Sequence, residues 1–322
     1  MCTHYFRNLV LIVVAMLFLT ACTNTENAAI KLGINPWPGY EFLYLAQEMG
    51  FYEQVGVDVK IIEYGSLSDV RRGYERGNLD AMATTLIELL QVKEHSKRDP
   101  VVFLIADFSY GGDVIIARKS INSIGELKKK KIGADTTSLP IFILARALKL
   151  HNLSLDDIHI VPLEQTELEQ AYINGELDAV VTYPPVSVRL QSRADSSIVF
   201  STKEIPGEVI DVISVEKKLL EKRPEDIRKI KAAWQLALQY SKKNPAEAHQ
   251  IMAKREGISA EEFRQALGDL QIIAESDQQK YFKQLKHNLE NTRSILMKTG
   301  VLSTNTSAEC CIPDMRLLFK EQ

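Results

Sequence analysis

Residues 74–81 read YERGNLDA, and residues 172–179 read YINGELDA. A threonine follows each copy at the same distance, at Thr84 and Thr182, so the shared pattern is Y-x-x-G-x-L-D-A-x-x-T. Each copy predicts the end of a helix, a tight turn and a buried strand. Coincidence is the alternative, but both copies lie in the same strand–helix–strand context. We therefore expect two similar α/β units of about 90 residues each, and hence two lobes.

Short β-like runs alternate with helical stretches around both copies, which is the pattern of an α/β fold. The first unit predicts strands at 30–34, 57–63, 81–84, 101–105 and 113–117, and helices at 41–49 and from a Ser68 cap to about residue 76. The second unit predicts strands at 131–134 and 158–162, and helices at 139–149 and 168–174. After Val215 we expect an almost wholly helical chain, with helices at 224–243, 245–254, from a Ser259 cap, and at 276–298, packed on the outside of a lobe.

The first 22 residues predict an export signal that is not part of the fold. Residues 9–19 (LVLIVVAMLFL) are apolar, and small residues then lead to Cys22. The run is shorter than the about 20 residues that span a bilayer, which favours a secretory signal. The LTAC sequence at 19–22 resembles the lipobox of bacterial lipoproteins, in which the cysteine is acylated and becomes the new N-terminus. Residues 23–29 then form a polar tether; the alternatives are an ordinary signal with a chance cysteine and an uncleaved anchor.

Composition is that of a soluble globular protein, with 45% apolar and 25% charged residues. The net charge of −3 is spread along the chain, so we expect no nucleic-acid partner. Adjacent Cys310 and Cys311 could bridge only in a strained ring, and no nearby Cys or His completes a metal site. We therefore expect neither a structural disulfide nor a bound metal there. Residues 301–322 predict a loosely attached tail.

A longer stretch, GINPWPGYEFLYLAQEMGFYEQVGVDVKIIEYG at 33–65, resembles the opening of the nitrate/sulfonate/taurine-type solute-binding proteins of ABC transporters. Four further segments fit that family in order: GNLDAMATT, DFSYGGDVIIARKSINSIGELKKKKIGADTTS, GELDAVVTYPP and STKEIPGEVIDVISV. The match covers about residues 30–298. One departure is TYPP at 182–185, where many relatives carry Trp-Glu-Pro.

This resemblance implies the type 2 periplasmic binding fold, an α/β fold of two lobes with C-terminal helices. We expect lobe one at 30–117 plus 206–300 and lobe two at 118–205, joined by crossings near 117–120 and 201–206. The resemblance also implies a binding protein that captures a small molecule in the inter-lobe cleft for an ABC importer.

An enzyme is the minor alternative, because the thiamine-pyrimidine synthases of fungi share this fold. Those enzymes carry a cysteine-rich active-site motif and a lysine that holds pyridoxal phosphate. The two lobes here contain no cysteine cluster, H-E-x-x-H, G-x-S-x-G or P-loop sequence. We therefore expect no catalytic residues and no cofactor.

Ligands of open α/β sheets bind beyond the carboxyl ends of the strands, and this rule selects the same loops as the resemblance. Trp37 and Tyr40 follow the first strand, and prolines on either side of Trp37 stiffen the loop. Trp37 offers a stacking face worth about 0.5–2 kcal/mol to a cationic group. The other predicted ligand-binding residues are Ser66, Thr84, Thr85, Asp107, Tyr110, Ser138, Tyr183 and Asp211. The alternatives are structural: aromatic plugs of a lobe's core, helix caps and loop-stabilising carboxylates.

Charge in these loops is one-sided, because they contain acids but no Lys or Arg. The acids are Glu41, Asp69, Glu88, Asp107, Asp113, Asp135 and Asp211. An amine, a zwitterion or a nitrogen heterocycle therefore fits best, with Asp107 and Asp211 as partners of a cationic nitrogen. A sulfonate or nitrate stays open, because helix N-termini also bind anions.

The expected partners are the small-molecule ligand, an ABC permease and the membrane that holds the lipid on Cys22. We expect a monomer. A lipid-anchored protein of this fold can also present its ligand to a membrane sensor, and the sequence does not separate the two roles. Thr23 is not the Asp that retains lipoproteins in the inner membrane, so we expect a lipoprotein facing the periplasm or the cell exterior, in either membrane.

Overall fold

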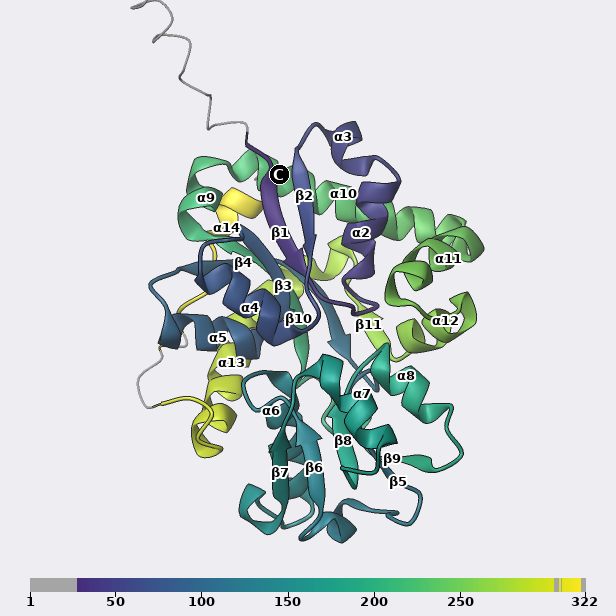
Figure 1. The fold of residues 1–322 in the computed structure, drawn as a ribbon. Coiled ribbons are helices and arrows are strands. Elements are labelled where there is room, and N and C mark those ends of the chain that lie inside the picture. The colour runs from purple at the N-terminus through teal and green to yellow at the C-terminus, as the bar shows by residue number, and fades with distance from the viewer. Residues whose placement is uncertain (1–27, 304–306, 308, 320–322) are drawn as a thin grey trace, which may run out of the picture.

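The structure is a computed structural model that describes residues 28–303, 307 and 309–319. Two lobes, each built on its own sheet, lie one above the other in Figure 1. The predicted signal at 1–22, the acylated Cys22 and most of the predicted tether at 23–29 lie outside the described residues. Within the described part, no helix combines the length and apolar character needed to cross a membrane.

The first lobe is built on six strands: β1 (Ile30–Ile34), β2 (Val59–Glu63), β3 (Ala81–Thr85), β4 (Pro100–Ser109), β10 (Ile210–Glu216) and β11 (Leu270–Ile272). Their order in the sheet is β11-β4-β10-β3-β1-β2. β1 runs parallel to β2 and β3, whereas β10 is antiparallel to β3 and β4. Every residue of β3 and β4 is buried, as expected for strands covered on both faces. The short β11 lies in the region that the sequence predicted to be almost wholly helical.

The second lobe repeats this arrangement with five strands: β5 (Val114–Arg118), β6 (Lys131–Ala134), β7 (His159–Pro162), β8 (Ala179–Thr182) and β9 (Ser196–Ser201). Their order is β7-β6-β8-β5-β9. β6 is parallel to β7 and β8, and β5 is antiparallel to β8 and β9. In both sheets, three parallel strands therefore adjoin one antiparallel strand, which is β10 in the first lobe and β5 in the second.

The first crossing differs from the prediction near 117–120, because β5 belongs to the second sheet. Val114 lies opposite Thr182 of β8 and opposite Ser201 of β9. The chain therefore leaves the first lobe after Ser109, and β10 returns to it at Ile210. An apolar run such as VIIA fits either sheet, so only the pairing decides which lobe it joins.

Helices cover both sheets. In chain order they are α2 (Glu41–Glu48), α3 (Phe51–Val55), α4 (Leu67–Glu75), α5 (Leu86–His95), α6 (Leu139–Leu150), α7 (Gln165–Ile173), α8 (Val186–Gln191), α9 (Lys217–Lys222), α10 (Pro224–Lys243), α11 (Pro245–Glu256), α12 (Ala260–Gly268), α13 (Glu275–Lys298) and α14 (Met315–Leu318). Short 3₁₀ helices lie at Ile124–Leu127, Leu155–Asp157 and Thr202–Glu204. Ser66, and not the predicted Ser68, caps α4, because its hydroxyl accepts from the N–H of Asp69.

The two copies of the sequence repeat fold alike, which confirms the two α/β units. Asp80 Oδ2 accepts a hydrogen bond from the N–H of Lys31 at 2.9 Å. Asp178 Oδ2 accepts from the N–H of Lys131 at 2.8 Å. In each lobe the aspartate thus ties the turn before one strand to the start of its parallel neighbour.

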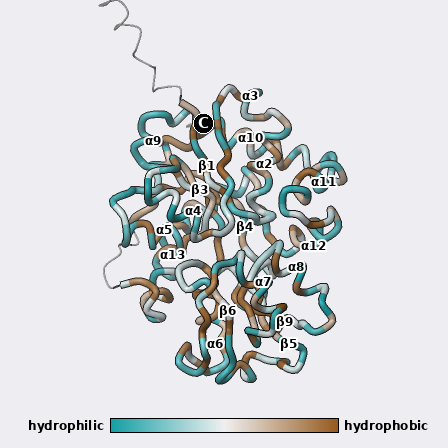
Figure 2. Tube along the Cα trace, viewed as in Figure 1, coloured by the Kyte–Doolittle hydropathy of each residue, from teal (hydrophilic) through white to brown (hydrophobic). Residues whose placement is uncertain are grey.

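The C-terminal helices complete the first lobe. Trp234 of α10 is fully buried and meets Phe42 of α2 edge-on, with ring centroids 5.4 Å apart. Figure 2 shows hydrophobic residues along the strands of both lobes and hydrophilic residues on many outer turns.

The prediction of a loosely attached tail is wrong for the described part of residues 301–322. Leu302, Cys311 and Leu318 are buried, and the Cys311 carbonyl accepts from the N–H of Val102 at 2.9 Å. These apolar side chains join the core of the first lobe, a contact that sequence spacing does not reveal. Cys310 and Cys311 are free thiols whose Sγ atoms lie 2.8 Å apart.

Candidate functional site

A narrow space lies where the strand ends of the two lobes meet. As the lobes stand it has no room for a water molecule, and it is lined by Asn35, Trp37, Tyr40, Leu67, Asp113, Leu139, Tyr183 and Asp211. The first lobe supplies most of this lining, and the second lobe closes it through α6 and the residues after β8. The space lies beyond the carboxyl ends of β1 and β8, where the fold places ligands.

Three buried aromatic rings form one wall of this space. Trp37 lies 6.5 Å from Tyr40 and 6.0 Å from Tyr183, measured between ring centroids, and meets Tyr183 edge-on. Two glycines allow the close packing. A Cβ on Gly39 would lie 2.0 Å from Asp107 Oδ2, and one on Gly112 would lie 2.7 Å from Trp37 Cη2.

Two carboxylates lie beside these rings. Asp107 of β4 and Asp211 of β10 pair directly across the first sheet, and both are buried. Trp37 Nε1 donates to Asp107 Oδ2 at 3.3 Å, and the Tyr40 hydroxyl donates to Asp211 Oδ1 at 2.5 Å. Like charges directly opposite in a sheet are destabilising, so this pairing disfavours the ionised form of both acids.

Burial governs the protonation of these acids. Burial, together with the potential of Glu88, raises the pKa of Asp113 to about 7. Burial also raises the pKa of Asp107 to about 8, although the hydrogen bond from Trp37 opposes this. The pKa of Asp211 lies well above its usual value because of burial and the neighbouring Asp107. These carboxyl groups therefore tend to hold their protons, and a bound cation could take the place of a proton.

Several oxygens that line the space have no hydrogen-bond partner among the described residues. They are both carboxylate oxygens of Asp113, Oδ2 of Asp211 and Oδ1 of Asn35. All are acceptors and all are buried. An unsatisfied buried polar atom costs about 1–3 kcal/mol, so this lining is suited to a group that donates hydrogen bonds.

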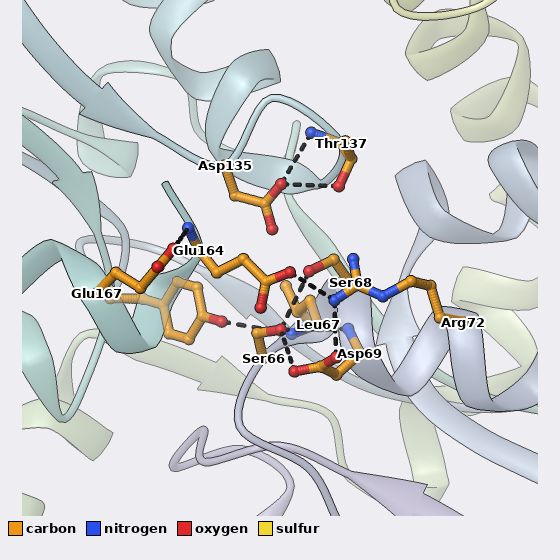
Figure 3. A network of polar contacts seen from close by, with 10 residues as sticks. Ser66, Leu67, Ser68, Asp69, Arg72, Asp135, Thr137, Glu164 and Glu167 are labelled. Atoms are coloured by element: carbon orange, nitrogen blue, oxygen red, sulfur yellow. Dashed lines mark hydrogen bonds and ion pairs between the residues drawn. The ribbon is translucent and has the colours of Figure 1, made fainter. Parts of the chain in front are cut away.

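Polar contacts hold the lobes together around the space. Glu88 of α5 accepts from Ser138 and from the first N–H of α6 in the second lobe. The Tyr183 hydroxyl lies 3.5 Å from the N–H of Leu67. At the rim, Arg72 Nη2 lies 2.7 Å from Glu164 of the second lobe and 2.7 Å from Asp69 of its own helix (Figure 3).

The structure brings together most of the residues predicted from the sequence. Trp37, Tyr40, Tyr183 and Asp211 line the space. Asp107 lies behind Trp37 and beside Asp211. The predicted alternative role, helix capping, is observed for Ser66 at α4 and for Thr85 at α5. Thr84 and Ser138 instead donate to Glu88.

Tyr110 does not belong to the group, because its side chain is 51% exposed on the crossing between the lobes. The sequence reasoning missed Asn35, Leu67, Asp113 and Leu139 as individual lining residues. It had selected the loops that contain them, but leucine at the start of a helix gives no functional signal.

The predicted one-sidedness of charge holds for the lining but not for every acid in these loops. Arg255 of α11 pairs with the buried Glu41, with Nε and Oε2 3.0 Å apart. Arg255 lies more than two hundred residues further along the chain, so the sequence could not pair them. Among the described residues, no group of three or more His, Cys, Asp or Glu side chains is placed to hold a metal ion.

Sequence comparison relates this chain to one protein family and to proteins that are named for binding. The sequence profile of the family described as "NMT1/THI5 like" matches residues 37–248, about two thirds of the chain. A protein of Brucella abortus (strain 2308), whose name gives binding only as its expected role, is 24% identical over 253 residues, 74% of this chain and 75% of that protein. The taurine-binding periplasmic protein of Escherichia coli (strain K12) is 24% identical over 137 residues, 41% of this chain and 42% of that protein.

Solved structures confirm the two-lobed fold. The alkanesulfonate-binding protein of Xanthomonas axonopodis pv. citri, bound to MOPS, has a TM-score of 0.75 at 15% identity, covering 86% of this chain and 95% of that one. A Candida albicans protein described as having the generic periplasmic binding protein fold has a TM-score of 0.66 at 16% identity, covering 86% and 92%. A desulfurization enzyme has a TM-score of 0.63 at 17% identity, covering 87% and 95%. At these identities the likeness concerns the fold alone, and this fold carries both binding proteins and an enzyme.

Proposed function

Because the chain belongs to the NMT1/THI5-like family, we propose that it is a solute-binding protein that captures a small molecule between its lobes and delivers it to an ABC importer. The names of its relatives support binding, and the sulfonate- and taurine-binding proteins among them support a periplasmic setting. The proposal includes no catalytic residue, and the enzyme of the same fold supplies the alternative.

The ligand in this proposal carries a cationic or hydrogen-donating nitrogen, as an amine, a zwitterion or a nitrogen heterocycle does. One observation carries this choice: the unpartnered atoms that face the narrow space are oxygen acceptors. The lining contains two acids and no Lys or Arg. An ammonium group would satisfy Asp113 and Asp211 and exchange its charge for their protons, while Trp37 would supply a ring face.

Capture proceeds by hinge closure. The two moving bodies are the first lobe at 30–109 plus 210–303 and the second lobe at 114–201. The hinge segments are 110–113 and 202–209, where the chain crosses between the sheets. A ligand held by Asp211 of one lobe and Tyr183 of the other stabilises the closed form more than the open one, as a population shift requires.

Acylation at Cys22 would tether the protein to the membrane beside the permease that receives the ligand. A polar segment at 23–29 supports this arrangement, because it would let the lobes extend from the anchored cysteine toward the permease. Metabolic labelling with a palmitate analogue tests the tether. We expect the label to enter the wild type and not Cys22→Ser, and equal labelling of both would contradict it.

A thermal-shift screen with amines, sulfonates and pyrimidines tests the ligand class. A bound ligand raises Tm by mass action, and at 100 times its Kd it stabilises by about 2.7 kcal/mol. We expect nitrogen-bearing cations to raise the Tm of the wild type and to raise that of Asp113→Asn much less. A screen in which only sulfonates raise Tm would contradict the proposed ligand.

A further inference from the structure

Glu88 is the one acid of the site that binds both lobes at once. It lies in the first turn of α5, where Oε2 accepts from the Thr85 N–H at 3.1 Å and from the Thr85 hydroxyl at 2.5 Å. Its other oxygen, Oε1, reaches the second lobe and accepts from Ser138 Oγ at 2.7 Å and from the Leu139 N–H at 2.9 Å. The carboxylate is buried, and its two bonds from Ser138 and Leu139 join the lobes in this arrangement.

The place that Glu88 occupies in the second lobe suits an anion. It lies at the N-terminus of α6, a helix of 12 residues, where the helix dipole and free N–H groups favour negative charge. Leu139 donates its N–H to Glu88. Pro140 has no N–H, and the N–H of Ile141 bonds to the Ser138 carbonyl. The donors at this helix start are therefore already used.

We propose that Glu88 acts as a built-in anion, which closes the lobes by occupying the N-terminus of α6 and thereby excludes negatively charged ligands from the site. This inference rests on the proposed binding function and assigns a specificity residue to it. The contrast with Asp113 supports the assignment. Both Asp113 oxygens lack partners, whereas both Glu88 oxygens are satisfied, so Asp113 is free for a ligand and Glu88 is not.

The sequence repeat offers a second, independent comparison. Glu88 lies three residues after Thr85, and Val186 lies three residues after Tyr183, at the equivalent place of the second copy. Val186 begins α8 and has no charge with which to bridge the lobes. The bridging carboxylate is thus a feature of one copy and not a requirement of the motif.

Two variants and one control test the proposal. Glu88→Ala removes the carboxylate and opens the helix start. Glu88→Gln keeps the size but leaves a single accepting oxygen, so it should lose the bonds to one of the lobes. Glu167→Ala is the control, because exposed Glu167 caps the start of α7 in the same way without reaching the other lobe.

Small-angle X-ray scattering of the four proteins without added ligand reports closure. We expect Glu88→Ala to have the largest radius of gyration and Glu88→Gln an intermediate one, while Glu167→Ala matches the wild type. Should both Glu88 variants stay as compact as the wild type, the closing role would be wrong. If Glu88→Ala does not fold, the comparison of Glu88→Gln with the wild type decides.

Calorimetry with methanesulfonate and with sulfate reports anion exclusion. We expect Glu88→Ala to bind methanesulfonate about two- to thirtyfold more tightly than the wild type, which is the gain that an anion draws from a helix N-terminus. Wild type that binds either anion as tightly as Glu88→Ala does would overturn the exclusion.

The amines of the thermal-shift screen keep this proposal separate from the proposed ligand class. An amine that stabilises the wild type supports the nitrogen ligand whatever the Glu88 variants do. A gain of anion binding in Glu88→Ala, with no amine binding to any protein, would keep the role of Glu88 and reject the nitrogen ligand.

Discussion

The two lobes carry two copies of one motif, and the copies agree in their scaffold. In each, a leucine covers a glycine of the first strand. A Cβ on Gly33 would lie 2.4 Å from Leu79 Cδ1, and one on Gly133 would lie 2.6 Å from Leu177 Cδ1. These glycines let the turn of the motif pack tightly on its parallel neighbour in both lobes.

The two lobes also place an acid at the same point. On β10, the residue after Asp211 pairs with Thr84, and on β5 the residue after Asp113 pairs with Thr182. Thr84 and Thr182 close the two copies of the motif, so Asp211 and Asp113 are equivalent. Both acids line the space between the lobes.

The copies differ in what satisfies these acids. Tyr40, which precedes α2, donates its hydroxyl to Asp211. Ser138, which precedes α6 in the same manner, donates to Glu88 instead. Asp113 is therefore left without the donor that its counterpart has. The difference shows that two copies of one scaffold can differ in a single internal hydrogen bond, which leaves one acid of the proposed site without a partner.

The largest expected effect concerns the scaffold that the two copies share, and it is an effect on stability. Leu79→Ala and Leu177→Ala should each lower the free energy of unfolding by about 2–5 kcal/mol, because both side chains are buried. Urea denaturation measures this, with the exposed Ile173→Ala as the control. If only one of the two substitutions lowered the free energy of unfolding, the two copies would not be equivalent.

The equivalent acids predict the next effect, on ligand affinity. Asp113→Asn should weaken the binding of a cationic amine by about 1.5–3 kcal/mol, the range for hydrogen bonds to charged groups. Asp211→Asn should cost less, because Asp211 already accepts from Tyr40. Calorimetry on both variants measures the order, and equal losses would show that the missing donor does not matter.

Protonation of Asp113 predicts a pH dependence of stability. Its pKa is raised to about 7 in the folded protein, above the value of about 3.9 in an unfolded chain. Between about pH 4 and 7 the folded protein binds the extra proton, so the free energy of unfolding falls as pH rises through this window.

The difference between wild type and Asp113→Asn isolates this contribution from those of other carboxylates. We expect the wild type to lose up to about 1.4 kcal/mol more per pH unit than the variant, measured by urea denaturation from pH 4 to 7. Parallel profiles for the two proteins would mean that Asp113 titrates normally.

Trp37 predicts the smallest effect. Trp37→Phe keeps an aromatic face but loses the N–H that bonds Asp107 at 3.3 Å. We expect amine affinity to change by about 0.5–1.5 kcal/mol, the net worth of one hydrogen bond. Tyr110→Phe, on an exposed ring, should leave the affinity unchanged. A larger loss of affinity there than at Trp37 would mean that the ligand binds near Tyr110 and not near Trp37.

Much of the fold could be predicted because local patterns decided it. The prolines at 224 and 245 open α10 and α11 as predicted, since a first-turn proline needs no N–H partner. The repeat likewise predicted two lobes. The sheet that β5 joins could not be predicted, because the sequence of a buried apolar strand does not indicate which strands it pairs with.

The candidate site was predictable as a set of loops but not as a set of atoms. Trp37, Tyr40 and Asp211 lie together, although Asp211 is distant in sequence, because strand ends converge. Which acid lacks a donor depends on the pairing of Tyr40 and of Ser138 across the structure. Sequence spacing contains no trace of those pairings, nor of the bridge that Glu88 forms.

The most direct test is a calorimetric comparison of two ligands that differ only in charge. The wild type and Asp113→Asn are titrated with the most stabilising amine of the screen and with the sulfonate of the same carbon skeleton. We expect the amine to bind the wild type more tightly than the sulfonate does, and Asp113→Asn to lose most of that preference. A sulfonate that binds the wild type more tightly than the amine would contradict the central claim, that the unpartnered acid just before β5 selects a nitrogen ligand.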